Sequence, residues 1–257
     1  MPHEPFEVLY CGDTALDNAA CYLAGLLALA RRTFRYVRSD ESISPADRDD
    51  HWNLIVLSDY PASRLSDDDH KAIVNRVQQG AGLLMIGGWE SFHGLGGNWN
   101  DTPIARLLPV EIASTDDRMN CDRPLIVRRC GRHPITEDLP WDDRPPLIGG
   151  LNRVMARPMA NILLAAELWD MKRNSDELEL SRQSSHVLLA VGYSGNGRTA
   201  AFASDIAPHW VGPLVDWGLP RVTAAAPGAP AIEVGAHYAK FFTKLIDWTG
   251  GWLNTVE

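Results

Sequence analysis

Four predicted strands are each followed by side chains that could move protons on a bound substrate. Three of the strands end in Asp13, Asp59 and Glu90, and the fourth is followed by Asp205 and His209. Carboxyl groups and an imidazole are the side chains that most often act as general acids and bases. Parallel strands of an open sheet end on one edge, where the loops diverge and leave a crevice. We therefore expect these residues to converge on one mouth.

Two tryptophans, Trp89 and Trp210, adjoin these acids and are expected to form the walls of the mouth. The acids and His209 could instead hold a divalent metal ion, because carboxylate oxygens and one imidazole suit several such ions. The sequence contains no HxH, HxxxH or HxxEH cluster, and the ligands would come from four separate loops. We therefore predict a site for a small-molecule ligand without metal or cofactor. Alternatively, the acids have no ligand and form hydrogen bonds within their loops.

Ser91 lies in the glycine-rich segment GGWESFHG, which follows a buried strand. A nucleophilic role would need His209 as its base and Asp205 or Asp13 to orient the imidazole. Alternatively, the hydroxyl caps the following turn, and the lack of Gly-x-Ser-x-Gly spacing favours this interpretation. Glu90 leaves a similar choice between a general base and a solvated loop acid.

Arg118, three isolated histidines and Cys11 could also have a function, but each has a structural interpretation as well. Arg118 could bind a ligand carboxylate or phosphate through its fork of donors, or form an ion pair with a neighbouring aspartate. The isolated histidines His51, His93 and His133 are interpreted as hydrogen-bonding residues. Cys11 ends the first strand, with no cation adjoining it in sequence, and is interpreted as a small buried hydrophobe.

The elements that must position these residues alternate between strands and helices over the first hundred residues. The apolar patterns predict strands at 6–13, 34–39, 51–61 and 82–88, and helices at 17–33 and 65–82. Ser66 is the predicted N-cap of the second helix, and Gly80 follows its end. This alternation indicates an α/β fold with a parallel sheet and right-handed crossovers.

The second half of the chain is less regular. Residues 100–185 are rich in Pro, Asp and Arg and suggest short strands at 123–129 and 160–166 that decorate the same sheet. Residues 186–205 predict a β-hairpin whose turn is Ser-Gly-Asn-Gly. A Pro-, Gly- and Ala-rich loop at 219–235 precedes a closing amphipathic helix. We expect residues 1–257 to form one domain.

Composition excludes several classes of partner. The 257 residues include 33 Asp and Glu against 24 Lys and Arg, a net charge of −9, and no basic run long enough to follow a phosphate backbone. No apolar run reaches the ~18 residues needed to span a bilayer, and the first residues lack a basic segment followed by an apolar one. The four cysteines have no paired spacing. We expect a cytoplasmic protein with free thiols, no nucleic-acid or membrane partner, and possible homo-oligomerisation.

Several segments in this order resemble a known family. They are GLLMIGGWESFHG, PVEIASTDDR, HPI and GYSGNGRTAAFASDIAPHW, followed by an aromatic helix that ends near Trp248. Together they resemble the putative glutamine amidotransferase-like proteins, which share the flavodoxin-like fold of class I glutamine amidotransferases. The resemblance implies a flavodoxin-like sheet with helices on both faces, to which the hairpin would be an addition.

One departure from the class I pattern affects the expected activity. Working class I amidotransferases carry Gly-x-Cys-x-Gly at the strand-end elbow, where the thiolate attacks glutamine. Here the elbow position falls on Trp89 or Glu90. We therefore expect no glutamine hydrolysis by that route. Two functions remain open: a hydrolase of a small polar metabolite, or a non-catalytic module of the same fold that binds a small molecule or assists assembly.

Overall fold

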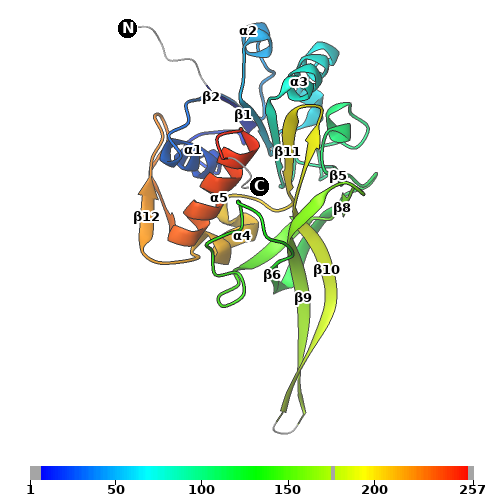
Figure 1. Ribbon diagram of the computed structural model, residues 1–257, viewed down its shortest axis with the longest axis vertical. Helices are drawn as coiled ribbons and strands as arrows, with labels where there is room; N and C mark the ends of the chain where they lie inside the picture. The colour runs from blue at the N-terminus through cyan, green and yellow to red at the C-terminus, as the bar shows by residue number, and fades with distance from the viewer. Residues whose placement is uncertain (1–6, 175–176, 254–257) are drawn as a thin grey trace.

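A nine-stranded sheet forms the centre of the computed structural model, which describes residues 7–174 and 177–253 (Figure 1). Its strand order is β2-β1-β3-β4-β11-β10-β9-β6-β7. The first five strands in this order are mutually parallel: β2 (Phe34–Val37), β1 (Val8–Gly12), β3 (Leu54–Ser58), β4 (Gly82–Ile86) and β11 (Gly197–Phe202). The other four continue the sheet in antiparallel pairs: β10 (Glu177–Ser194), β9 (Asn161–Asn174), β6 (Arg118–Arg129) and β7 (Leu147–Asn152).

Helices cover both faces of the parallel strands. The strands β1, β3 and β4 are buried along their whole length, as the continuous apolar runs in their sequences require. One face packs against apolar residues of α1 (Ala20–Leu29), α4 (Pro208–Val215) and α5 (Ala236–Thr249). The opposite face packs against α3 (Asp67–Gln79). The chain is therefore α/β, with a layered arrangement around the strands that lead to the candidate site.

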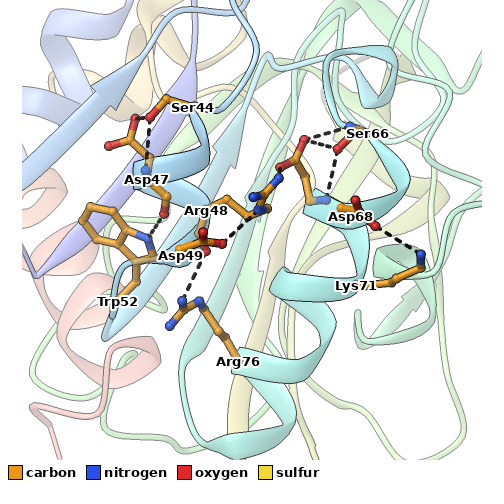
Figure 2. A network of polar contacts seen from close by, with 10 residues as sticks. Ser44, Asp47, Arg48, Asp49, Trp52, Ser66, Asp68, Lys71 and Arg76 are labelled. Carbon is orange, nitrogen blue, oxygen red and sulfur yellow. Dashed lines mark hydrogen bonds and ion pairs between the residues drawn. The ribbon is translucent and has the colours of Figure 1, made fainter.

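Local side-chain contacts fix the start of α3, as predicted. The Ser66 hydroxyl accepts the Asp69 N–H, and the Asp69 carboxylate accepts the Ser66 N–H in return, which forms a capping box. Arg48 of the short helix α2 (Pro45–Asp49) lies 3.9 Å from the Asp69 carboxylate and its carbonyl accepts from Arg76 (Figure 2). These contacts tie α2 to α3.

The segment between residues 100 and 185 differs from the prediction in extent. It contains β6, β7, β9 and the beginning of β10, together with η2 (Ile104–Arg106) and the small pair β5 (Val110–Glu111) and β8 (Met155–Ala156). The predicted strands were short because polar residues interrupt the apolar pattern of β9 and β10. These two strands pair with each other well beyond the edge of β6 and project from the body as a ribbon (Figure 1).

Two other boundaries differ from the predicted ones. The predicted loop at 219–235 contains an antiparallel pair, β12 (Arg221–Ala224) and β13 (Ile232–Gly235). The first predicted strand began at residue 6, which lies outside the described residues, and its described part begins at Val8. The short helical turn η1 (Ala62–Arg64) follows β3. Among the described residues, no helix is both long and apolar enough to cross a membrane.

Candidate functional site

The strand order brings the predicted strand ends together. Since β1, β3, β4 and β11 are consecutive parallel neighbours, their carboxyl ends share one edge. Asp13 and Asp59 follow β1 and β3 in left-handed backbone conformations, with φ of 32° and 49°. Aspartate tolerates this conformation better than most residues. The two side chains are thereby presented to the mouth directly at the ends of adjacent strands.

Two hollows occupy this edge, and they share Asp59 and Trp89 as common walls. The first has a volume of about 370 Å³ and is also lined by Asp13, Thr14, Ser39, Glu90, Leu95 and Gly96. The second has a volume of about 440 Å³ and is also lined by Asn120, Asp205, His209 and Trp210. The structure therefore places the predicted acids, His209 and both tryptophans around two adjoining hollows at this edge, which together form the mouth.

Burial makes two of these carboxyl groups unusually weak acids. Desolvation, followed by the charges of Asp59 and Asp205, raises the pKa of Asp13 to about 8. Desolvation and then the charge of Asp205 raise the pKa of Asp59 to about 7. The charge of Asp205 therefore disfavours ionisation of both carboxyls, and the charge of Asp59 adds to this effect at Asp13. At neutral pH the pair therefore retains a proton that an ordinary aspartate would have lost.

Asp205 and His209 form the other polar pair of the mouth. The His209 Nδ1 lies 3.2 Å from the Asp205 carboxylate, across one turn of chain. Asp205 is buried, whereas the His209 side chain is 68% exposed. The hydrogen bond to Asp205, followed by the charges of that and other acids, raises the pKa of His209. Pro208 begins α4, so the imidazole projects from the first turn of a helix.

Ser91 has a structural contact that differs from the cap proposed in the sequence analysis. Its side chain is buried, and its hydroxyl accepts the N–H of Asp59 at 2.9 Å, across from the neighbouring strand end. The Asp59 carboxylate in turn accepts the N–H of Glu90 at 2.7 Å. A Cβ at Gly88 would lie 2.2 Å from an Asp59 carboxylate oxygen, so a larger residue at this position would displace that carboxylate. Ser91 thus joins the β4 elbow to the loop that carries Asp59.

Two residues that the sequence analysis did not single out, Asp117 and Asn152, form hydrogen bonds that hold the elbow in place. The Asp117 carboxylate accepts the backbone N–H groups of His93 and Gly94, at 2.9 and 3.0 Å, and the Asn152 amide at 2.8 Å. Asn152 also forms a reciprocal pair of hydrogen bonds with the backbone of Gly88. Both side chains are buried. The sequence analysis considered the adjacent Arg118 and missed Asp117. No local pattern distinguishes the buried Asp117 from the exposed Asp116.

Arg118 and Trp89 lie together at the rim. The Arg118 guanidinium binds the carboxylate of Asp116 and lies 4.4 Å from the centre of the Trp89 ring. The local ion pair considered in the sequence analysis is therefore present, and the guanidinium also contacts a wall of the mouth. Trp210 is buried and donates from its indole N–H to Asn120 at 2.7 Å. Trp89 remains half exposed and is the wall that a ligand can contact most freely.

The other titratable candidates lie elsewhere. His133 packs edge-on against Trp248, and burial lowers its pKa to about 4. His51 contacts Arg76 beside α3, and the His93 ring contacts the neighbouring Gly94 carbonyl. Within residues 7–174 and 177–253, no three His, Cys, Asp or Glu side chains are placed to hold a metal ion. Cys11 is fully buried in β1, and desolvation raises the pKa of its thiol far above its ordinary value.

Comparison with known families identifies the chain. Residues 49–220 match the family model GATase1-like, which is described as putative glutamine amidotransferase. The chain belongs to this family. The match includes β3, the β4 elbow and both Asp205 and His209, so the GATase1-like assignment covers most of the mouth. No functionally curated protein matches the sequence.

Solved structures share the fold of this GATase1-like chain. The cytoplasmic proteins STM3548 and STM1381 from Salmonella typhimurium both have a TM-score of 0.72, with identities of 21% and 22%. Each alignment covers 95% of this chain and 99% of the other protein. A putative ThuA-like protein from Parabacteroides merdae has a TM-score of 0.60 and 13% identity, with 99% of this chain and 93% of that one covered. At these identities the likeness concerns the fold alone.

Proposed function

We propose that this chain is a hydrolase that acts on a small polar metabolite in the strand-end mouth, by acid–base chemistry and without a cysteine nucleophile. The observation that carries the proposal is that two pairs of side chains with opposite roles line the mouth. In the first pair, Asp13 and Asp59 are weak acids. In the second pair, Asp205 orients the imidazole of His209. A weakly acidic carboxyl beside an imidazole that a carboxylate orients is a usual arrangement for general acid–base chemistry.

The roles follow from the hydrogen bonds. When Nδ1 of His209 donates to Asp205, Nε2 is left as an acceptor that can take a proton from a water molecule. That water would attack the scissile bond of a substrate held between Trp89 and Trp210. The protonated carboxyl of Asp59 or Asp13 would donate a proton to the leaving group. In this scheme Ser91 positions Asp59, because the Ser91 hydroxyl already accepts the Asp59 N–H. Glu90 forms part of the wall of the mouth.

The first prediction concerns these two roles. In a screen of small amides, esters and glycosides, His209→Ala and Asp59→Asn are each expected to lower kcat/KM at least ~100-fold, the usual size of a general acid or base contribution. Activity should rise with pH as His209, whose pKa is raised above its ordinary value, loses its proton, and fall as Asp59 and Asp13 ionise near pH 7 and pH 8. His51→Ala serves as a matched control, since His51 lies beside α3.

Melting temperatures distinguish catalysis from folding. His209→Ala should leave the melting temperature nearly unchanged, because the imidazole is mostly exposed. If ligands that bind the mouth are found but none is turned over, the alternative applies: a non-catalytic module that binds a small molecule or assists assembly. Full activity in both His209→Ala and Asp59→Asn would refute the acid–base scheme.

The second prediction concerns glutamine. The purified protein is expected to release no ammonia from glutamine at a rate typical of an amidotransferase, because Trp89 and Glu90 occupy the elbow and the Cys11 thiol is buried. An ammonia assay before and after thiol alkylation measures this directly. Ammonia release that disappears when Cys11 is labelled would contradict it, and Cys11→Ala would then abolish the activity.

The proposal also includes the location of the protein, the arrangement of its sheet and the kind of partner it binds. A cytoplasmic location is supported by the two Salmonella typhimurium structures, which are described as cytoplasmic proteins. The strand order of the parallel half supports a flavodoxin-like arrangement within one domain, to which β10 and the neighbouring antiparallel strands are additions. We further propose that the partner is a small molecule, with neither nucleic acid nor membrane involved.

A further inference from the structure

A third hollow lies outside the mouth, between the end of α1 and the edge strand β2. It has a volume of about 460 Å³ and is lined by Leu16, Ala28, Arg31, Arg32, Thr33, Phe34, Tyr36 and Pro227. Its walls are mainly apolar, and its polar groups are concentrated on the two arginines. Apolar hollows of this size with a few convergent polar groups are the usual form of a small-molecule site.

The two arginines of this hollow differ in their contacts. Arg32 is engaged by the carboxylates of Glu7 and Asp247 and lies over the Trp252 ring. Arg31 is exposed, and within the described part of the chain its guanidinium has no hydrogen bond or ion pair. Its backbone has a left-handed conformation, with φ of 59°, directly after the last turn of α1. A free cation therefore stands at the border of an apolar hollow in a protein of net charge −9.

The aromatic wall of the hollow is connected to the mouth. The Tyr36 ring lines the hollow, and its hydroxyl donates to the carbonyl oxygen of Asp13 at 2.6 Å. Tyr10 packs against both Phe34 and Tyr36, with ring centres 6.3 and 5.2 Å apart. The Tyr10 hydroxyl is fully buried and lies close enough to the Asp13 carboxyl to lower its pKa, without a hydrogen bond of ordinary geometry. Phe34 and Tyr36 therefore contact both the hollow and the groups that surround Asp13.

We propose that this hollow is a second binding site, for a small amphipathic anion whose apolar body packs on Phe34 and Tyr36 and whose carboxylate or phosphate pairs with Arg31. Occupancy is transmitted to the mouth through Tyr36, which holds the Asp13 turn. The binding part of this inference is independent of the proposed hydrolase activity. The transmitted part predicts regulation of Asp13, whatever reaction the mouth performs.

Octanoate serves as the probe, and isothermal titration calorimetry measures its binding to the full chain. We expect saturable binding with one site per chain, and at least ~10-fold weaker binding of octan-1-ol, which has the same chain and no charge. Arg31→Asn should weaken octanoate at least ~10-fold, and asparagine tolerates the left-handed backbone. Arg31→Lys keeps the charge and should restore most of the affinity. Arg35→Asn is the matched control, since Arg35 lies on β2 but pairs with Asp47 away from the hollow.

Filling the hollow gives an independent test of its location. Ala28→Phe should abolish octanoate binding, whereas Leu29→Phe, one residue further along α1 and outside the lining, should not. Failure of octanoate to saturate the wild-type protein would overturn the proposal. Equal affinity in the wild type, Arg31→Asn and Ala28→Phe would also overturn it, because the anion would then bind elsewhere.

Carbon-13 NMR of the Asp13 carboxyl tests the connection to the mouth. Saturating octanoate should change the apparent pKa of Asp13 by at least ~0.3 pH unit, because octanoate packs on Tyr36, whose hydroxyl donates to the Asp13 carbonyl oxygen. In Tyr36→Phe, binding should persist while this change is lost. An identical Asp13 titration with and without octanoate in the wild type would refute the transmission and leave only a separate binding site.

Discussion

Replacing Asp117 with alanine is expected to lower the free energy of unfolding by about 3–5 kcal/mol, because it removes the shared acceptor of three hydrogen-bond donors at the elbow. The carboxylate accepts hydrogen bonds from three donors, namely the backbone N–H groups of His93 and Gly94 and the Asn152 amide. Without it, these buried donors lose their partner inside the protein, and each unsatisfied donor costs about 1–3 kcal/mol. Urea denaturation followed by tryptophan fluorescence measures the change.

The neighbouring residue supplies the control for this prediction. Asp116 is exposed and forms a surface ion pair with Arg118, so Asp116→Ala should cost less than about 1 kcal/mol. Asp117→Asn should fall between the two, because the amide keeps one acceptor oxygen and the shape of the side chain. If Asp117→Ala and Asp116→Ala destabilise the protein equally, Asp117 does not hold the elbow in the way described.

Replacing Asp13 with asparagine is expected to stabilise the protein at high pH. The pKa of Asp13 is about 8 in the folded protein and about 3.9 in an unfolded chain. Because folding favours the protonated form, the contribution of Asp13 is greatest below pH 3.9 and is lost progressively as the pH rises through 8. Asparagine cannot ionise, so Asp13→Asn should exceed the wild type by about 2–5 kcal/mol at pH 9 and match it near pH 4.

Asparagine suits this test because it accepts the left-handed backbone of position 13. Urea denaturation at pH 4.5, 7 and 9 measures the difference. Asp40→Asn is the control with the opposite sign, because the hydrogen bond from Arg38 lowers the pKa of the exposed Asp40 carboxyl. A stability difference between wild type and Asp13→Asn that does not grow with pH would show that Asp13 is ionised in the folded protein at neutral pH.

Local sequence signals were sufficient to predict the half of the sheet that carries the mouth. The apolar runs of β1, β3 and β4 are continuous because helices cover both faces, and the Ser66 capping signal is contained within four residues. The acids at the strand ends could therefore be assigned to one edge. The rule that parallel strands with crossover connections end on the same side needs only the order of elements in the chain.

Long-range pairing decided the features that the sequence analysis missed. The long ribbon of β9 and β10 and the pair of β12 and β13 depend on backbone hydrogen bonds to partner strands, so their own patterns are weak. The same holds for Asp117 and Asn152, which are 35 residues apart and meet beneath the elbow of Gly88.

For the site as a whole, the sequence determined which chemical groups stand at the strand ends, since residue type and element order are both local properties. Only the tertiary structure decided how each group behaves. The close approach and burial of Asp13 and Asp59 raise their pKa values, the turn of α4 sets His209 against Asp205, and the Ser91 hydroxyl is used by the backbone of Asp59. Desolvation and through-space charge depend on neighbours that are distant in the chain, which no local pattern encodes.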